Sequence, residues 1–245
     1  MDNLRRYILS TFNLGVDIDA VQYCKNSRLQ ILNKEKYCIY SAPIPYKHLK
    51  AREEEYKNHI IKAARAWSEI LDNKIRFEMT DSIYGADIKL YWTKASINYS
   101  GMQYFEENGN KKIPCTAIGL INASGTDFSS EDVYKIILHE FGHIFGLGHS
   151  VDKNDVMGKM WEQPNEPSKN DILVLKLIYS LGPKTYSECE QFIENYIIQN
   201  TEKHCNISNF NRNIFDETQF IGILNRYHLI LQKNLSSRAI SYSHA

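Results

Sequence analysis

The feature that most constrains this chain is the segment His139–Ser150, HEFGHIFGLGHS, which places three histidines four and then six residues apart. Four residues of an α-helix advance by about 400°, so His139 and His143 project from one face, one turn apart. Two imidazoles in this arrangement can both bind a Zn²⁺ ion at about 2.0–2.1 Å. The spacing therefore predicts a helix that carries a metal site.

The residues between and after these histidines predict what the metal would do. Glu140 points to the adjacent side of the helix, where its carboxylate can touch a zinc-bound water and act as the general base of a metallopeptidase. Gly146 can adopt a positive φ without steric cost, so the chain can turn there and return His149 as a third ligand. Three histidines leave the fourth tetrahedral position to water, which is typical of a catalytic site. We therefore expect one catalytic zinc ion.

The length of the pattern decides between this reading and a simpler one. A lone H-E-x-x-H is also found on helix surfaces that carry two solvated histidines. The extended pattern H-E-x-x-H-x-x-G-x-x-H arises by chance in roughly one of 10⁴–10⁵ chains of this composition. The metal site is therefore favoured, and the chain's remaining histidines show no ligand spacing with one another.

The sequence around the motif predicts an α+β fold in which helices pack on one mostly contiguous sheet. Residues 53–73 carry an apolar stripe at helical spacing, which makes Trp67 a core residue. Ser129 and Asp132 form a capping-box pattern that opens the histidine helix, and a later helix is predicted over 168–180. The predicted strands are 37–45, 75–80, 86–92, 101–105 and 115–123, the last two separated by a turn signal at Asn108-Gly109.

Both ends of the chain differ from this central region. Residues 1–35 show no strong period and are predicted to form an N-terminal extension. The composition changes beyond Gly182-Pro183, and apolar stripes predict a helical C-terminal extension over 182–245, capped at Ser187 and continued by a stripe from Phe220 to Leu231. The zinc metallopeptidase catalytic domain is thus expected to span residues 36–181.

Charge and composition exclude several other functions. Lysine plus arginine and aspartate plus glutamate both number 29, so the net charge is zero and offers no electrostatic footprint for nucleic acid or an anionic membrane. A peptide or protein substrate is the expected partner, and a monomer is the favoured state. No window approaches the ~18 apolar residues of a membrane span. The five scattered cysteines predict buried thiols rather than a disulfide framework.

Beyond the zinc motif, the sequence resembles the metzincin zinc peptidases and, among them, the matrixins. Ser150 and Asp152 reproduce the H-S-x-D that follows the third histidine in matrixins. Met157 lies eight residues after His149, at the family's methionine turn. Trp161 lies four residues further on, where matrixins have an aromatic residue in the wall of the S1′ pocket. NDILVLKLIYS (170–180) is similar to the family's closing helix.

This resemblance implies a twisted, mostly parallel sheet with an antiparallel edge strand, an active-site helix and a closing helix. It also implies that Met157 is a floor beneath the metal ligands and that Asp171 supports the methionine turn. Trp161 and its neighbour Met160 would shape the substrate pocket, although Gly-Lys follows Met157 where matrixins usually have Tyr-Pro. No structural zinc cluster or D-x-D-x-D-G calcium loop is evident.

Several assignments stay open on the sequence alone. Asp152, Asn154 and Asp155 could bind calcium, but solvated loop acids are the favoured interpretation. Cys24 could act as a latency switch on the zinc, but a structural or surface thiol is favoured because the family's surrounding motif is absent. Matrixins usually act outside the cell, whereas the residues after Arg5 and Arg6 make a poor signal peptide, which would suggest a cytoplasmic location or leaderless release.

The interpretation that follows is a zinc-dependent endopeptidase in which Glu140 activates the water. The alternative is a zinc-holding binding module with a peptidase fold that does not cleave, or a latent protein whose zinc is covered by an extension. Segment 101–105 is predicted as the edge strand that pairs with an extended substrate, with segment 115–123 as the other candidate.

Overall fold

The computed structural model describes residues 3–12, 28–96, 100–108, 111–158 and 164–205. The chain divides into two compact units, residues 1–189 and 190–245, and the described part of the second unit is helical. The sheet and the three motif histidines belong to the first unit.

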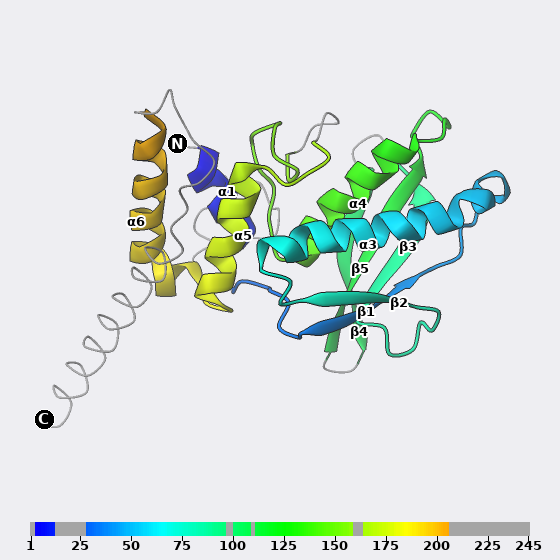
Figure 1. Ribbon diagram of the computed structural model, residues 1–245, viewed down its shortest axis with the longest axis horizontal. Coiled ribbons are helices and arrows are strands. Elements are labelled where there is room, and N and C mark those ends of the chain that lie inside the picture. Colours follow the sequence, from blue (N-terminus) through cyan, green and yellow to red (C-terminus); the bar gives the residue numbers. More distant parts are fainter. Residues whose placement is uncertain (1–2, 13–27, 97–99, 109–110, 159–163, 206–245) are drawn as a thin grey trace, which may run out of the picture. The chain divides into compact units, whose positions relative to one another are not determined.

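The first unit is built on a sheet whose described strands run in the order β2-β1-β3-β5-β4 (Figure 1). β2, β1, β3 and β5 run parallel to one another, and the edge strand β4 is antiparallel to β5. This arrangement confirms the α+β fold with a mostly parallel sheet and an antiparallel edge strand. The strands span Lys36–Ser41 (β1), Arg76–Thr80 (β2), Ile88–Lys94 (β3), Gly101–Asn108 (β4) and Lys111–Ile121 (β5).

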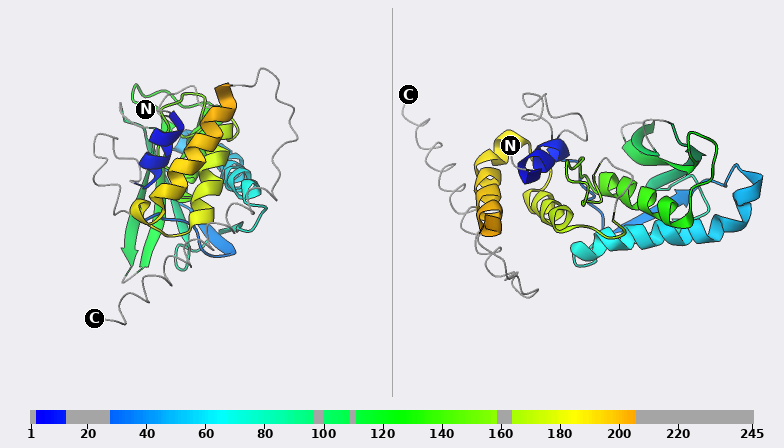
Figure 2. Two further views of the ribbon diagram at one scale, coloured as in Figure 1. Left: turned by 90° about the vertical axis from the view of Figure 1, so that its left-hand side faces the viewer. Right: turned by 90° about the horizontal axis from the view of Figure 1, so that it is seen from above.

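Two helices, α3 (Glu53–Ile70) and α4 (Ser130–Ile144), pack side by side against one face of the sheet (Figures 1 and 2). A short 3-10 helix, η2 (Lys47–Arg52), leads into α3. The stripe on α3 is buried as its periodicity indicated, and fully buried Trp67 donates from its indole Nε1 to the Leu138 carbonyl of α4 at 2.8 Å. This bond fixes α3 against the helix that carries the histidine motif.

The structure contains one element that the sequence pattern did not reveal. Residues Asn3–Phe12 form the helix α1, which packs against α5 (Lys169–Leu181) (Figure 1). The helix was missed because its run of buried side chains covers only ten residues and was read together with the residues that follow it, which carry no strong period. Those buried side chains are Leu4, Tyr7, Ile8, Leu9, Ser10, Thr11 and Phe12.

Several predicted strand boundaries were wrong by a few residues, among them the ends of β1 and β4 and the start of β5. β5 begins at Lys111 rather than at Cys115, because two lysines and a proline hid its start, and Asn108 pairs with Lys111 across the hairpin. The cap of helix α6 (Tyr186–Cys205) is formed by Thr185 and Glu188, not by Ser187: the Thr185 backbone N–H donates to the Glu188 carboxylate at 2.6 Å. The turn at Gly109 and the stripe from Phe220 lie outside the described residues.

None of the helices in the described part of the chain combines the length and apolar character that crossing a bilayer requires.

The start of α4 offers a test of the fold. Ser129 and Asp132 form the expected capping box, in which the Ser129 side chain accepts from the Asp132 backbone N–H at 3.1 Å. Ser129→Ala removes this acceptor and should lower the free energy of unfolding by about 1 kcal/mol. Urea denaturation measures the loss, with Ser124→Ala in the preceding exposed loop as the control. Equal stabilities for the two variants would show that the box does not hold α4.

Candidate metal centre

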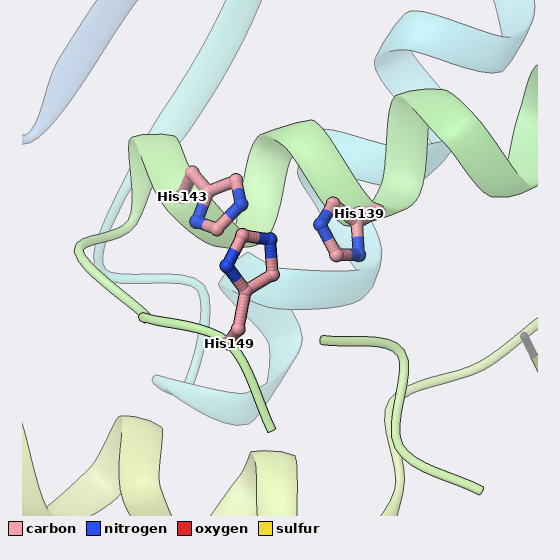
Figure 3. Close-up of side chains that lie close together, drawn as sticks. All are labelled: His139, His143 and His149. Carbon is pink, nitrogen blue, oxygen red and sulfur yellow. The ribbon is translucent and has the colours of Figure 1, made fainter. Parts of the chain in front are cut away.

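The three motif histidines lie together at the end of α4. His139 and His143 stand one turn apart on the helix, and His149 returns from the following loop to face both (Figure 3). Their ring centroids are 4.8 Å (His139–His143), 5.2 Å (His139–His149) and 4.7 Å (His143–His149) apart. One nitrogen from each ring lies within 4.8 Å of the others. This cluster could therefore hold a single metal ion.

Backbone carbonyls set the orientation of two of the rings. The Nδ1 atom of His139 lies 2.8 Å from the Val156 carbonyl oxygen, and that of His143 lies 2.8 Å from the Leu147 carbonyl oxygen. A carbonyl oxygen can only accept, so each Nδ1 carries the proton and Nε2 carries the lone pair. The tautomer that both bonds select is the one that binds a metal through Nε2.

Burial keeps these imidazoles neutral. It lowers the pKa of His139 to about 4, with a further contribution from the neighbouring His149. Burial also lowers the pKa of His143 well below its usual value, and the two other histidines act in the same direction. Because a neutral imidazole is the form that coordinates a metal, the site is preorganised for an ion at neutral pH.

The turn that returns His149 is made at Gly146, as the sequence predicted. Its φ is +98°, a left-handed value that other residues rarely adopt. Its backbone N–H donates to the His143 carbonyl at 2.9 Å, which ends the helix directly after the second histidine. A side chain at this position would also overlap the Gln30 carbonyl, so both φ and packing require glycine.

The Glu140 carboxylate is buried beside the cluster. Its Oε2 atom has no hydrogen-bond partner among the residues that the structure describes, and burial raises the pKa of Glu140 to about 8. The carboxylate lies against the start of β4, where a Cβ added to Gly101 would be 2.8 Å from the Glu140 Cδ. A nearby cation offsets the cost of burying this charge. A buried carboxylate beside three clustered histidines therefore fits a divalent metal.

Met157 lies beneath the histidine helix. It is fully buried, and its Sδ and Cε atoms occupy the space where a Cβ of Gly142 would project. Its carbonyl accepts from the Ser150 backbone N–H at 2.8 Å, which ties this turn to the residue after His149. Met157 is thus placed where a floor of the metal site would lie.

Asp171 holds the same turn from the other side. Its carboxylate accepts hydrogen bonds from the backbone N–H groups of Val156 at 2.8 Å and Met157 at 3.5 Å. The Val156 carbonyl, in turn, accepts from His139. Burial raises the pKa of Asp171, while hydrogen bonds from Tyr7, Ser168 and Val156 oppose that rise. The Asp171 carboxylate therefore orients the Val156 backbone, which in turn orients His139.

Asp155 is not the solvated loop acid that the sequence suggested. It is 2% exposed, and its carboxylate accepts from the Ser150 hydroxyl at 2.5 Å and the Ser168 hydroxyl at 2.5 Å. The amide of Asn170 adds contacts of 3.3 Å to both carboxylate oxygens. Asp155 thus joins the loop after His149 to the start of α5, and these donors rather than solvent occupy its oxygens.

Met160, Trp161 and Cys24 lie outside the described residues. Across the described ranges, no second group of histidine, cysteine, aspartate and glutamate side chains comes together as a metal site.

Sequence reasoning missed Gly101 and Gly142, and it misjudged Asp155 as a solvated loop acid. Gly142 lies inside the motif, where its place between Glu140 and His143 could have marked it. For Gly101 and Asp155 no local pattern existed, because their partners are distant in the sequence.

Comparison with known families gives one match. The family model described as Matrixin matches residues 35–180, more than half of the chain. No curated protein matches the chain.

Replacing Asp171 tests its role at the metal centre. Asp171→Asn removes the negative charge that holds the Val156–Met157 turn, so we expect metal affinity to fall by about tenfold. We also expect the free energy of unfolding to fall by about 2 kcal/mol. Competition with a chelator measures the affinity. Asp132→Asn is the control, because Asp132 occupies the same capping-box position at the start of α4 without contacting the turn. Equal metal affinity in the two variants would show that Asp171 does not support metal binding.

Proposed function

Since the chain belongs to the matrixin family, we propose that it is a zinc-dependent endopeptidase that hydrolyses peptide bonds. In this proposal His139, His143 and His149 hold one zinc ion, and Glu140 is the general acid and base. Matrixins are zinc metallopeptidases, so the family supplies the reaction class and this chain's residues supply the roles.

The observation that best supports the proposal is the state of Glu140. Its carboxylate is buried, has one oxygen without a described hydrogen-bond partner, and follows His139 directly on α4. A purely structural acid in the core is normally satisfied by donors, as Asp155 and Asp171 are here. An unsatisfied carboxylate next to three histidines is instead suited to take up a proton during a reaction.

The bound zinc would supply Lewis acidity, which polarises the scissile carbonyl and lowers the pKa of an attacking water. Glu140 would accept the proton of that water and then deliver it to the leaving amine. Val156 and Leu147 carbonyls would keep His139 and His143 in their ligand tautomers throughout. Burial of the carboxylate would strengthen each of these interactions, because it excludes bulk water.

The sheet edge beside Glu140 supports an extended peptide as the substrate. β4 pairs only with β5 among the strands that the structure describes, so its other edge presents backbone groups to a partner strand. Gly101, its first residue, abuts the Glu140 carboxylate, and the next side chain, Met102, is 46% exposed. A peptide added along β4 would therefore pass the general base. By resemblance, Trp161 and Met160 would line its S1′ pocket.

The first test is cleavage of a quenched-peptide library by the zinc-loaded full chain. Glu140→Gln preserves the shape of the side chain but cannot take up a proton, so kcat/KM should fall by about 10²–10⁴-fold while zinc content stays the same. Glu131→Gln makes the same change on the exposed first turn of α4 and should retain activity. The sequences of the products would report whether a large apolar residue enters S1′.

Two results would contradict the proposal. Cleavage by Glu140→Gln at the wild-type rate would exclude Glu140 as the base. If the wild type holds one zinc ion but cuts nothing in the library, the non-cleaving or latent module becomes the better interpretation.

Gly101 provides a second test, of the contact between the edge strand and the base. Gly101→Ala adds a methyl group that must displace the Glu140 carboxylate, and we expect kcat to fall by about 10²-fold. The three atoms nearest to the added methyl all belong to Glu140 and none to a histidine, so zinc content and the unfolding midpoint serve as controls and should change little. Full activity in the variant would mean that Glu140 does not work from the position it has here.

A further inference from the structure

Helix α1 lies outside the segment that matches the family, yet it contacts the metal centre directly. The matched segment begins at residue 35, whereas α1 spans Asn3–Phe12. Its apolar side chains, such as fully buried Ile8, anchor it in the first unit next to α5. Three polar residues of this helix, Tyr7, Ser10 and Thr11, form hydrogen bonds with the segments around the histidines.

Two of these polar residues hold the backbone of the third-histidine loop. The Ser10 hydroxyl donates to the His149 carbonyl oxygen at 2.5 Å. The Thr11 hydroxyl accepts from the Gly148 backbone N–H at 3.1 Å. The approach is so close that a Cβ on Gly148 would lie 2.5 Å from the Thr11 nitrogen. The backbone of α1 therefore packs directly against the backbone at Gly148, and the hydroxyls of Ser10 and Thr11 hold the two segments in place.

The third polar residue reaches the other side of the site. The Tyr7 hydroxyl is buried and donates to the Asp171 carboxylate at 2.7 Å. Asp171 accepts from the Val156 N–H, and the Val156 carbonyl accepts from His139. Through Tyr7, α1 is thus connected to the first histidine as well as to the third.

We propose that α1 is a positioning element of the metal centre, in which Ser10 and Thr11 hold the His149 loop in its ligand geometry. The proposal rests on the proposed function, because it assumes that His149 binds the metal. Once His139 and His143 are placed by α4, the third ligand depends on a loop whose backbone is held by α1. Loosening that loop raises the entropy that must be lost when the third ligand engages.

The test is metal binding by the full chain with single hydroxyls removed. Ser10→Ala and Thr11→Val should each raise the dissociation constant for Zn²⁺ about tenfold in competition with a chelator. In the Co²⁺-substituted proteins, the visible absorption of a tetrahedral site should weaken or shift. Thr11→Ser retains the hydroxyl and should restore both readouts.

Ser180→Ala is the matched control, because the Ser180 hydroxyl also lies near the carbonyl oxygen three residues earlier in its helix, as the Ser10 hydroxyl lies near that of Tyr7, but has no bond to the loop. It reproduces the loss of a helix hydroxyl without touching the His149 segment. Its Zn²⁺ affinity and Co²⁺ spectrum should equal those of the wild type.

The outcomes separate this inference from the proposed function. If the wild type binds Zn²⁺ tightly and Ser10→Ala and Thr11→Val bind it equally well, the positioning role of α1 is wrong and the metal centre stands. If Thr11→Ser is as impaired as Thr11→Val, the hydroxyl is not the cause, which also overturns the inference. If the wild type itself binds neither Zn²⁺ nor Co²⁺, the proposed function is wrong, and the inference that rests on it is wrong with it.

Discussion

The carboxylate of Asp171 is the interaction on which the rest of the metal centre depends. It is fully buried and accepts from the Tyr7 hydroxyl, from the Ser168 backbone N–H of its own helix cap, and from the Val156 and Met157 N–H groups. A buried carboxylate costs several kcal/mol unless such donors converge on it. The folded state therefore requires α1, the methionine turn and α5 to meet at one point. The position of the Val156 carbonyl, and with it the tautomer of His139, follows from that requirement.

A second buried carboxylate, Asp155, extends this support to the third histidine. The Ser168 hydroxyl donates to Asp155 and accepts from the Asp171 N–H, so one serine links the two acids. Asp155 also binds the hydroxyl of Ser150, the residue after His149. Because every member of this polar network shares a partner with another, loss of one leaves a neighbour unsatisfied in a low-dielectric interior. The described residues between His149 and Asp171 are therefore fixed by side-chain hydrogen bonds, although few of them lie in a helix or strand.

How much of this could be predicted depends on whether partners are close in sequence. The histidines, Gly146 and the Ser129 capping box are local patterns with one physical solution: in the structure the histidines lie together, the chain turns at Gly146 and the box caps α4. The α+β class followed from periodicity, and the parallel sheet from resemblance to the matrixins. Asp155 was read as solvated because its donors, Ser150 and Ser168, flank it at distances that no motif encodes. Helix α1 was missed because its ten residues were read as part of the segment 1–35, although Leu4, Tyr7, Ile8 and Phe12 recur at helical spacing.

The segment that matches the family is shorter than the compact unit to which it belongs, which spans residues 1–189. The match over 35–180 covers the sheet, the histidine helix and α5, but the backbone of Gly148 and His149 is held by residues from α1. An inhibitory cover would have to contact the face on which the imidazoles converge, and the His149 ring points to that face, toward His139 and His143 (Figure 3). The hydrogen bonds of α1 are instead to the loop backbone and to Asp171. In the proposed arrangement, removing this helix would take away support for His149 without uncovering the imidazoles, so the proposal assigns α1 to the metal centre in the same physical sense as the methionine turn.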